Sequence, residues 1–435
     1  MPPDRSPDSS RQVAGVRRPP RRPGQLRIGM ALYGDLTYDS RVQREARALA
    51  EAGYSVSLMC LSGTTGSGDL HPDVHVTLER PTATKTLPGG VPAGSSGGIR
   101  SIGPLRRIEW LAAYIRNLRQ WGRLVVAAVG PVDGWHLHDL PSLVAILPLV
   151  GDSVPVVYDS HEIFIESGTA HMLPSPIRSL LRAYEKRLVS RVAAMVTVND
   201  SLANVLGKRY RPRRLVVVHN CTDRWDPAAS ATDKLRAAAG IPPSTPVILY
   251  LGGLGPARGI EQLALSLLEP CLEAAHLVLL GPSEHSARYQ SLAEDPRWRE
   301  RVHILEPVAP ADLPLWVHSA DVGGILIQAT TLNHRLSTPN KLFECLAAGV
   351  PVVVSDFPSM RRIVTADPSG WLGAVCDPAD VHAVATALRS ILDLDVADRS
   401  ALRDRCLAAA HRRWNWATEA EKLTVLYGEL LSGVP

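Results

Sequence analysis

Short, mostly β-branched apolar runs alternate with longer amphipathic stretches along most of the chain. Such runs, bounded by Gly, Pro and polar residues, predict strands covered on both faces, and the amphipathic stretches predict helices packed against them. The predicted strands are 26–34, 54–60, 74–79, 134–139, 154–161, 194–199 and 215–220, then 247–251, 276–280, 302–305, 322–328 and 350–354. Because the alternation occurs twice, we expect an α/β fold with two doubly wound, Rossmann-like domains facing each other across a cleft.

Changes in composition mark the borders of these domains. Residues 1–25 are rich in Pro, Arg and Ser and predict a disordered tail. We place the first domain at 26–222 and the second at 242–410, because 221–243 contains a Gly-Ile-Pro-Pro turn signal and reads as a hinge. Residues 81–98 are rich in Gly, Pro, Ser and Thr and predict a mobile loop, of the kind that often forms a lid or binding loop.

The stretch 337–356 predicts a helix, a tight stop and a buried strand. Thr338 has a side chain suited to the N-cap, and Pro339 suits the first helical position because its missing N–H costs no hydrogen bond there. Gly349 and Pro351 end the helix. The helix therefore starts with free backbone N–H groups, which favour an anion.

Three polar side chains lie on the same side of this helix. Lys341 lies in the first turn, and Glu344 follows Lys341 and Asn340 by three and four residues. A cation and free amides beside a carboxylate acceptor suit a nucleoside diphosphate and its ribose hydroxyls.

Length, charge and cysteine content narrow the function classes. The 435 residues suit two domains, and much of the net charge of +4 comes from the tail, which carries Arg5, Arg11, Arg17, Arg18, Arg21 and Arg22. The remainder is near neutral, so we expect no nucleic-acid partner. The six Cys residues form no C-x-x-C pair, which predicts reduced thiols in a cytoplasmic protein. No apolar run approaches the length of about 18 residues that would predict a membrane span.

A helix predicted at 100–128 carries aromatic residues among six arginines. It fits two interpretations: peripheral contact with the inner face of an anionic membrane, or an ordinary amphipathic helix whose Arg side chains face water. We favour the second, because basic amphipathic helices are common in soluble proteins.

Polar residues follow three strands of the first domain, at the edge where parallel sheets bind ligands. They include Gly34, Asp35 and Arg41, then His136, His138 and Asp139, and finally Asp159, His161 and Glu162. His136 and His138 have a metal-compatible spacing, but no third ligand is identifiable, and we predict no metal site. His161 fits a satisfied hydrogen-bonding residue and a substrate contact equally well.

A Gly-rich turn between a strand and a helix, 251–259, permits close approach of the backbone to a ligand. The turn contains Gly253 and places Arg258 at the start of the helix, where it could pair with a phosphate. It is neither a Walker A nor a G-x-G-x-x-G motif, and alone it fits an ordinary tight β–α turn as well.

Together, five segments resemble the retaining, nucleotide-sugar glycosyltransferases of family 4 (glycosyl transferases group 1), which have the GT-B fold. The most specific is 339–344, Pro-Asn-Lys-Leu-Phe-Glu, followed by Ala-Ala-Gly-Val-Pro-Val-Val at 347–353. The others are the helix at 39–53, the strand end at 159–162, the turn at 251–259 and the closing helix at 416–427. The resemblance extends over nearly the whole chain.

The resemblance implies two Rossmann-like domains in the GT-B arrangement, with the donor nucleotide held mainly by the second and a C-terminal helix, 411–435, crossing back to the first. It implies transfer of a hexose or related sugar from a nucleotide-diphosphate sugar to a hydroxyl group, with retention of configuration and without a metal or other cofactor. The acceptor classes left open are a glycan sugar, a lipid-linked compound and a small natural product.

The resemblance also implies roles for individual residues. His161 would touch the donor sugar near its reacting carbon, Glu344 would bind the donor ribose, and Arg258 would contact the diphosphate. The phosphates would be supported by the backbone at Asn340, Lys341 and Leu342, close to Gly253. The candidates for the acceptor side of the cleft are Gly34, Asp35, Arg41, His138, Asp139 and Glu162.

Two positions depart from the family pattern. Gly253 replaces the first diphosphate-binding Arg, and Leu336 replaces a Glu that many members carry eight residues before the ribose-binding Glu. Lys341 could restore the missing charge, which matters because the leaving nucleoside diphosphate gains charge in the transition state. Two alternatives therefore stay open: a sugar-nucleotide epimerase or phosphorylase of the same architecture, and a catalytically silent partner subunit.

Overall fold

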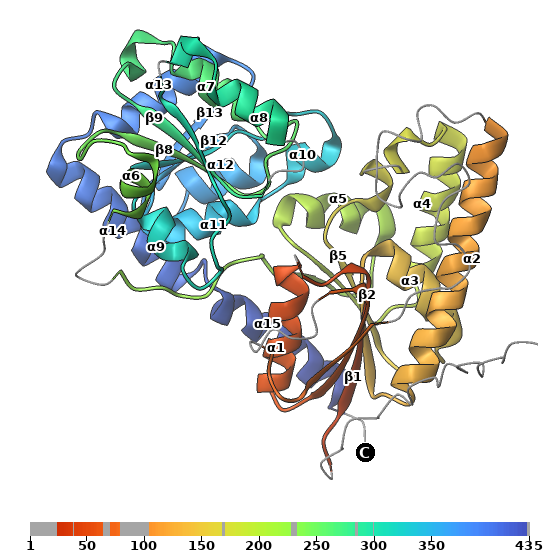
Figure 1. The fold of residues 1–435 in the computed structure, drawn as a ribbon. Helices are drawn as coiled ribbons and strands as arrows, with labels where there is room; N and C mark the ends of the chain where they lie inside the picture. The colour runs from red at the N-terminus through yellow and green to blue at the C-terminus, as the bar shows by residue number, and fades with distance from the viewer. Residues whose placement is uncertain are drawn as a thin grey trace, which may run out of the picture.

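Two parallel sheets with helices packed on their faces form the two halves of the protein (Figure 1). The first sheet has seven strands in the order β3-β2-β1-β4-β5-β6-β7, and the second has six in the order β10-β9-β8-β11-β12-β13. The strands are β1 (Arg27–Asp35), β2 (Ser55–Ser62), β3 (Val74–Leu78), β4 (Gly134–His138), β5 (Val156–Ser160), β6 (Ala194–Thr197), β7 (Leu215–Val217), β8 (Val247–Leu251), β9 (His276–Leu280), β10 (Val302–Leu305), β11 (Val322–Ile325), β12 (Val352–Ser355) and β13 (Gly373–Cys376).

The helices between these strands give each sheet its doubly wound topology. They are α1 (Ser40–Glu51), α2 (Pro104–Val129), α3 (Asp139–Ile146), α4 (Ser175–Val189), α5 (Asp200–Tyr210), α6 (Lys234–Ala239), α7 (Ile260–Ser266), α8 (Ser286–Ala293), α9 (Leu313–His318), α10 (Leu332–Leu336), α11 (Asn340–Ala347), α12 (Pro358–Thr365), α13 (Val381–Leu392), α14 (Val396–Arg412) and α15 (Trp416–Leu431).

This computed structural model describes residues 24–37, 39–63, 70–78, 104–167, 170–227, 233–282, 286–298 and 300–432. The predicted loop 81–98 lies outside the described residues, as does the predicted tail apart from its last two residues. The borders proposed for the domains stay a prediction.

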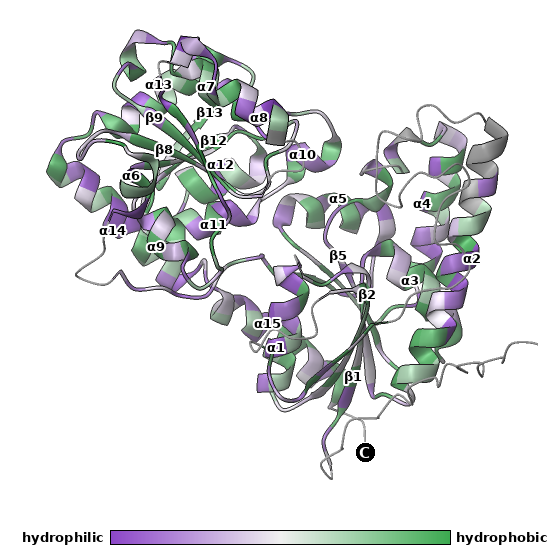
Figure 2. Ribbon diagram, in the orientation of Figure 1, coloured by the Kyte–Doolittle hydropathy of each residue, from purple (hydrophilic) through white to green (hydrophobic). Residues whose placement is uncertain are grey.

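Local sequence explains why these elements form. Strand β8, Val-Ile-Leu-Tyr-Leu, is buried along its whole length, as a central parallel strand must be. Helix α1 begins after Asp39, whose carboxylate accepts the backbone N–H of Val42 at 3.1 Å. The strands are mainly hydrophobic, whereas the helices carry hydrophilic residues as well (Figure 2).

The predicted α/β fold is confirmed, with corrections in detail. Helix α11 begins at Asn340, and Pro339 occupies the N-cap, so the predicted capping role of Thr338 is wrong. The Thr338 hydroxyl instead accepts a hydrogen bond from Asn199 of the first domain at 3.1 Å. Strand β13 and helices α10 and α12 were not predicted, because each is short and β13 begins with Gly373.

Helix α2 behaves as an ordinary amphipathic helix along its described side chains. Trp121 is buried in the core of the first domain, whereas Arg116, Arg119 and Arg123 are exposed. No described helix is both long enough and apolar enough to cross a membrane. Contact of α2 with a membrane surface stays a prediction.

Helices α15 and α10 both contribute contacts between the halves of the molecule. Helix α15 follows the second half in sequence but packs beside α1 (Figure 1), where Leu423 and Tyr427 join the hydrophobic cluster of the first sheet. Helix α10 of the second half contacts the first half. The side-chain amide of Asn333 accepts the backbone N–H of Ile163 at 2.9 Å and donates to the carbonyl of Ile163 at 3.0 Å. Leu336, which departs from the family pattern, packs into the first half's core and is 9% exposed.

Candidate active site

Lys341 reaches from the first turn of α11 back to the Gly-rich turn after β8. Its Nζ lies 3.7 Å from the centroid of the Tyr250 ring, and a Cβ built on Gly252 would lie 3.8 Å from the same nitrogen. The Tyr250 hydroxyl donates to the carbonyl of Gly253 at 2.8 Å. The ammonium group therefore lies beside the position where the family's Arg is absent, so its placement is compatible with the predicted compensation.

Arg258 and Glu344 flank Lys341. Burial, followed by the charge of Arg258, lowers the pKa of Lys341 to about 7. Burial raises the pKa of the Glu344 carboxyl, and the charges of Arg44 and Lys341 oppose that rise. Within the described part of the chain, neither Arg258 nor Glu344 has a hydrogen-bond or ion-pair partner, so both side chains are available to a ligand.

The start of α11 offers fewer backbone donors than predicted. The amide of Leu342 donates to the carbonyl of Pro339 at 3.0 Å, and the Leu342 side chain is fully buried. Among the described residues, the amides of Asn340 and Lys341 have no such partner. The Asn340 side chain is also engaged, because its Oδ1 accepts from Asn220 of the first half at 2.8 Å. Two amides of α11 therefore remain for an anion.

Lys341 gives the site a measurable pH dependence. A lysine with a pKa of about 7 is charged below that pH and becomes neutral above it. We expect affinity for a nucleoside diphosphate to fall as the pH rises from about 7 to about 9, because the neutral amine attracts phosphate less strongly. Isothermal titration calorimetry across this range measures the effect. The Lys341→Arg variant is the control, because Arg stays charged while the ligand titrates as before; parallel pH profiles would contradict the assignment.

Gly259, the residue after Arg258, has a backbone conformation and a close neighbour that only glycine accommodates. It adopts φ 78°, and a Cβ at this position would lie 2.1 Å from the carbonyl oxygen of Leu326. We expect Gly259→Ala to reduce the free energy of unfolding by at least about 2 kcal/mol, from backbone strain and a clash with fixed backbone. Chemical denaturation measures this change. Gly255→Ala is the matched control, since no atom lies within 4 Å of its added Cβ; equal losses would refute the explanation.

In the first half, His161 lies at the end of β5 between two carboxylates. Its Nδ1 lies 3.4 Å from Asp139 and its Nε2 3.2 Å from Asp159. Burial alone would lower the pKa of His161, but these two carboxylates outweigh burial and raise it to about 10. His161 is therefore an imidazolium near neutral pH, and its side chain is 19% exposed.

Asp139 holds His161 from the start of α3. Its carboxylate also accepts the backbone N–H of His161 at 3.1 Å. The predicted strand ended at Asp139, but β4 ends at His138, and Asp139 has φ 57°, an uncommon conformation for a residue other than Gly. This turn aims the carboxylate at His161.

Arg41 and His138 were predicted to line the acceptor side, and the structure corrects this. Arg41 is 2% exposed, and its Nε and Nη2 donate to the two oxygens of Asp159 at 2.8 and 3.0 Å. The same guanidinium pairs with Glu45 at 2.9 Å. His138 is fully buried, with its Nδ1 3.2 Å from Nε2 of His161. His138 therefore contacts His161 directly from the end of β4, and Arg41 on α1 acts on it through Asp159.

Two further residues of types that can bind metals, Glu45 and Asp159, lie beside His136 and His138, which the sequence did not reveal. Single ligand atoms of Glu45, His136, His138 and Asp159 all lie within 4.8 Å of one another. Arg41 already pairs with both carboxylates. Burial would lower the pKa of His136, but hydrogen bonds to Asp159 and Glu45 outweigh burial and raise this pKa. The Arg41 guanidinium already offsets part of the charge of the two carboxylates, so a metal dication would have to share them with a buried cation.

The remaining candidates lie around this centre. Gly34 is the last residue but one of β1, and the nearest atoms to an added Cβ there belong to Leu32, the first at 3.4 Å. Asp35 braces its loop, accepting the Thr37 amide and the Ser62 hydroxyl at 2.8 Å each. Burial raises the pKa of the Glu162 carboxyl, and the charge of Arg258 from the second half opposes this rise. Glu162 of the first half and Arg258 of the second half therefore influence each other electrostatically.

Sequence reasoning missed three contributors: Glu45, Arg44 and Asn333. The spacing of Arg41 and Glu45, four residues apart on one predicted helix, was a usable signal for an ion pair. Arg44 faces Glu344 only because the two halves meet, and no local pattern indicates such a contact. No local pattern indicates the contact of Asn333 with Ile163 either.

Comparison with known proteins agrees with this geometry. Residues 40–225 match the model for Glycosyltransferase Family 4, and residues 245–394 match that for Glycosyl transferases group 1. The chain is 28% identical over 349 residues to phosphatidyl-myo-inositol mannosyltransferase of Mycobacterium leprae, covering 78% of this chain and 83% of that protein. It is 25% identical over 314 residues to D-inositol 3-phosphate glycosyltransferase of Corynebacterium glutamicum, covering 69% and 70%.

Solved structures share the fold. Sucrose-phosphate synthase of Thermosynechococcus elongatus superposes with a TM-score of 0.69 at 17% identity, covering 94% of this chain and all of that one. At this identity the likeness concerns the arrangement of the two sheets and their helices.

Proposed function

The chain belongs to the family 4, group 1 glycosyltransferases of the GT-B fold, and from that premise we propose that it moves a sugar from a nucleotide-diphosphate sugar to a hydroxyl acceptor with retention of configuration. The observation that carries the proposal is the set of available groups around α11. Arg258, Lys341 and two unpartnered amides suit a diphosphate, and the Glu344 carboxylate suits ribose hydroxyls.

The proposed reaction needs no carboxylate acid–base pair. The bond between the anomeric carbon and the β-phosphate oxygen breaks, and the acceptor oxygen bonds to the same face of the sugar. The acceptor proton passes to the departing phosphate. Arg258 and Lys341 stabilise the charge that develops on this phosphate. The His161 imidazolium, held by Asp139 and Asp159, is proposed to orient the sugar.

The acceptor is proposed to carry a sugar or cyclitol hydroxyl. The names of the two curated relatives specify a phosphatidyl-myo-inositol mannosyltransferase and a D-inositol 3-phosphate glycosyltransferase. Glycan, lipid-linked and natural-product acceptors therefore all belong in a test, with inositol compounds among them.

The test is a matrix of nucleotide sugars and acceptors. Purified protein is incubated with UDP-, GDP-, ADP- and dTDP-sugars, each alone and with inositol phosphate, phosphatidylinositol vesicles or simple glycosides, and released nucleoside diphosphate is measured. We expect one donor to give acceptor-dependent release that persists with a chelator and is lost in Arg258→Gln. Binding and turnover of no donor, with stabilisation of a partner protein instead, would favour the silent subunit. Interconversion of a free nucleotide sugar would favour an epimerase.

A further inference from the structure

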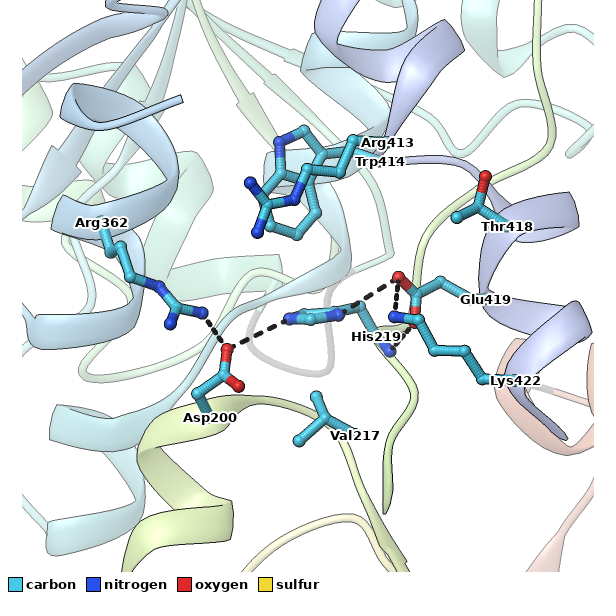
Figure 3. A pocket seen from close by; sticks show the side chains of 9 residues that line it. All are labelled: Asp200, Val217, His219, Arg362, Arg413, Trp414, Thr418, Glu419 and Lys422. Carbon is cyan, nitrogen blue, oxygen red and sulfur yellow. Dashed lines mark hydrogen bonds and ion pairs between the residues drawn. The ribbon is translucent and has the colours of Figure 1, made fainter. Parts of the chain in front are cut away.

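A cavity of about 370 Å³ lies where the two halves of the molecule and helix α15 meet (Figure 3). Its walls come from the start of α5, the end of β7, helix α12, the segment before α15, and α15 itself. The lining residues are Asp200, Val217, His219, Arg362, Arg413, Trp414, Thr418, Glu419 and Lys422. None of these residues belongs to the candidate donor site, so the cavity is a separate feature.

A rigid polar wall forms one side of the cavity. Glu419 accepts the backbone N–H of His219 at 2.8 Å, lies 3.3 Å from Nδ1 of the same residue, and accepts from Lys422 at 2.6 and 2.7 Å. Burial would raise the pKa of Glu419, but the hydrogen bonds from His219 and the charge of Lys422 lower it. Glu419 is thus a carboxylate whose partners are already in place.

His219 leaves one polar atom for the cavity. The residue is 6% exposed, and its Nε2 is buried without a hydrogen-bond partner among the described residues. The nearest carboxylate, that of Asp200, is 4.0 Å away, beyond hydrogen-bond reach, and Arg362 holds it. Figure 3 shows the His219 ring between Asp200 and Glu419. A buried nitrogen without a partner is costly, which points to a ligand atom at this position.

The charges around the cavity favour an anion. The cavity is lined by three cations, Arg362, Arg413 and Lys422. It is also lined by two carboxylates, those of Asp200 and Glu419, each of which already has a cationic partner. Within the described part of the chain Arg413 forms no ion pair, and its guanidinium lies 4.5 Å from the centroid of the Trp414 ring. A guanidinium held on an aromatic face presents its N–H groups in a plane suited to phosphate.

We propose that this cavity binds a small phosphate monoester. The phosphate would accept hydrogen bonds from Arg413 and Arg362, and a phosphate O–H would donate to Nε2 of His219. The cavity lies within the size range of small-molecule sites and exceeds the needs of a single inorganic anion, so an organic group would accompany the phosphate. Because Arg362 belongs to the second half and His219 to the first, a bound ligand would hold the halves at one angle.

Binding is tested without any glycosyl donor or acceptor, so the outcome is independent of the proposed transfer activity. Glucose 6-phosphate and glycerol 3-phosphate are titrated into the full chain by isothermal titration calorimetry, with inorganic phosphate alongside. We expect at least one monoester to bind with a Kd of about 1 mM or tighter, and more tightly than inorganic phosphate. Arg413→Gln should weaken binding by about tenfold or more.

Two variants locate the binding. Arg412→Gln is the matched control: Arg412 is the neighbouring cation, is exposed, does not line the cavity and donates to Ser369 at 2.6 Å. It should bind like the wild type. Arg258→Gln removes the donor-site cation and should also leave the affinity unchanged. The proposal is overturned if neither monoester binds, if inorganic phosphate binds as tightly, or if binding survives Arg413→Gln and is lost in Arg258→Gln.

Discussion

Replacing Asp159 by Asn is expected to reduce the free energy of unfolding by about 3–5 kcal/mol, the usual cost of removing one partner from a buried ion pair. Asp159 is fully buried, and its two oxygens accept from Arg41 at 2.8 and 3.0 Å. The variant leaves that guanidinium, also buried, facing an amide that cannot neutralise it. Chemical denaturation measures the loss.

The same substitution should change how stability depends on pH. Burial would raise the pKa of Asp159, but the charges of Arg41 and His161 outweigh burial and hold it well below its usual range. A carboxylate with a depressed pKa stabilises the fold fully above its unfolded value of about 4, and this contribution is lost as the pH falls through the folded value. Acidification should therefore destabilise the wild type by a contribution that Asp159→Asn lacks.

A surface ion pair provides the control for this prediction. Asp152 pairs with Arg191 at 2.9 Å but is 85% exposed. We expect Asp152→Asn to cost less than about 1 kcal/mol. If Asp159→Asn cost no more than Asp152→Asn, the buried network would not organise the first half of the site.

Replacing Glu344 by Ala should weaken nucleoside diphosphate binding by about 10- to 100-fold, the effect of losing hydrogen bonds to a charged partner. The carboxylate lies one turn after Lys341 and has no hydrogen-bond or ion-pair partner in the described part of the chain, so its loss disturbs few native contacts. Isothermal titration calorimetry with the nucleotide that the donor matrix identifies measures the change.

The ribose assignment can be separated from a general charge effect. A 2′,3′-dideoxy nucleoside diphosphate lacks the hydroxyls that Glu344 is expected to bind, so wild type and Glu344→Ala should bind it about equally. Glu273→Ala, at an exposed acidic residue just before β9, should bind both nucleotides like the wild type. A loss in Glu344→Ala that is the same for the ribose and dideoxy ligands would assign Glu344 a role other than ribose recognition.

Local patterns in the sequence indicated the candidate residues of the second half of the site. Helical spacing predicted Lys341 and Glu344 on one side of α11, and the Gly-rich turn predicted Arg258 at the start of the following helix, α7. The contact of Lys341 with Tyr250 joins segments that are distant in sequence, and no periodicity indicates which segments meet. The sequence therefore indicated Arg258, Lys341 and Glu344 as candidates but not how these residues approach one another.

The first half of the site was harder to predict for a physical reason. Arg41 follows the end of a strand. A charged residue at such a position can face a ligand site or can form a buried ion pair, and only the identity of its partners distinguishes the two. Glu45 lies on the same helix as Arg41, but Asp159 comes from β5, and only the fold brings that carboxylate to Arg41. Leu336 illustrates the converse: a departure from the family pattern in sequence is, in the fold, a packing contact between the halves.

The most direct test of the central claim is a crystal structure of the protein with the nucleoside diphosphate of its donor. We expect the diphosphate at the start of α11, within hydrogen-bond distance of Arg258 and Lys341, and the ribose hydroxyls on the Glu344 carboxylate. A nucleotide bound in the cavity at His219, or against the first sheet away from α11, would contradict it.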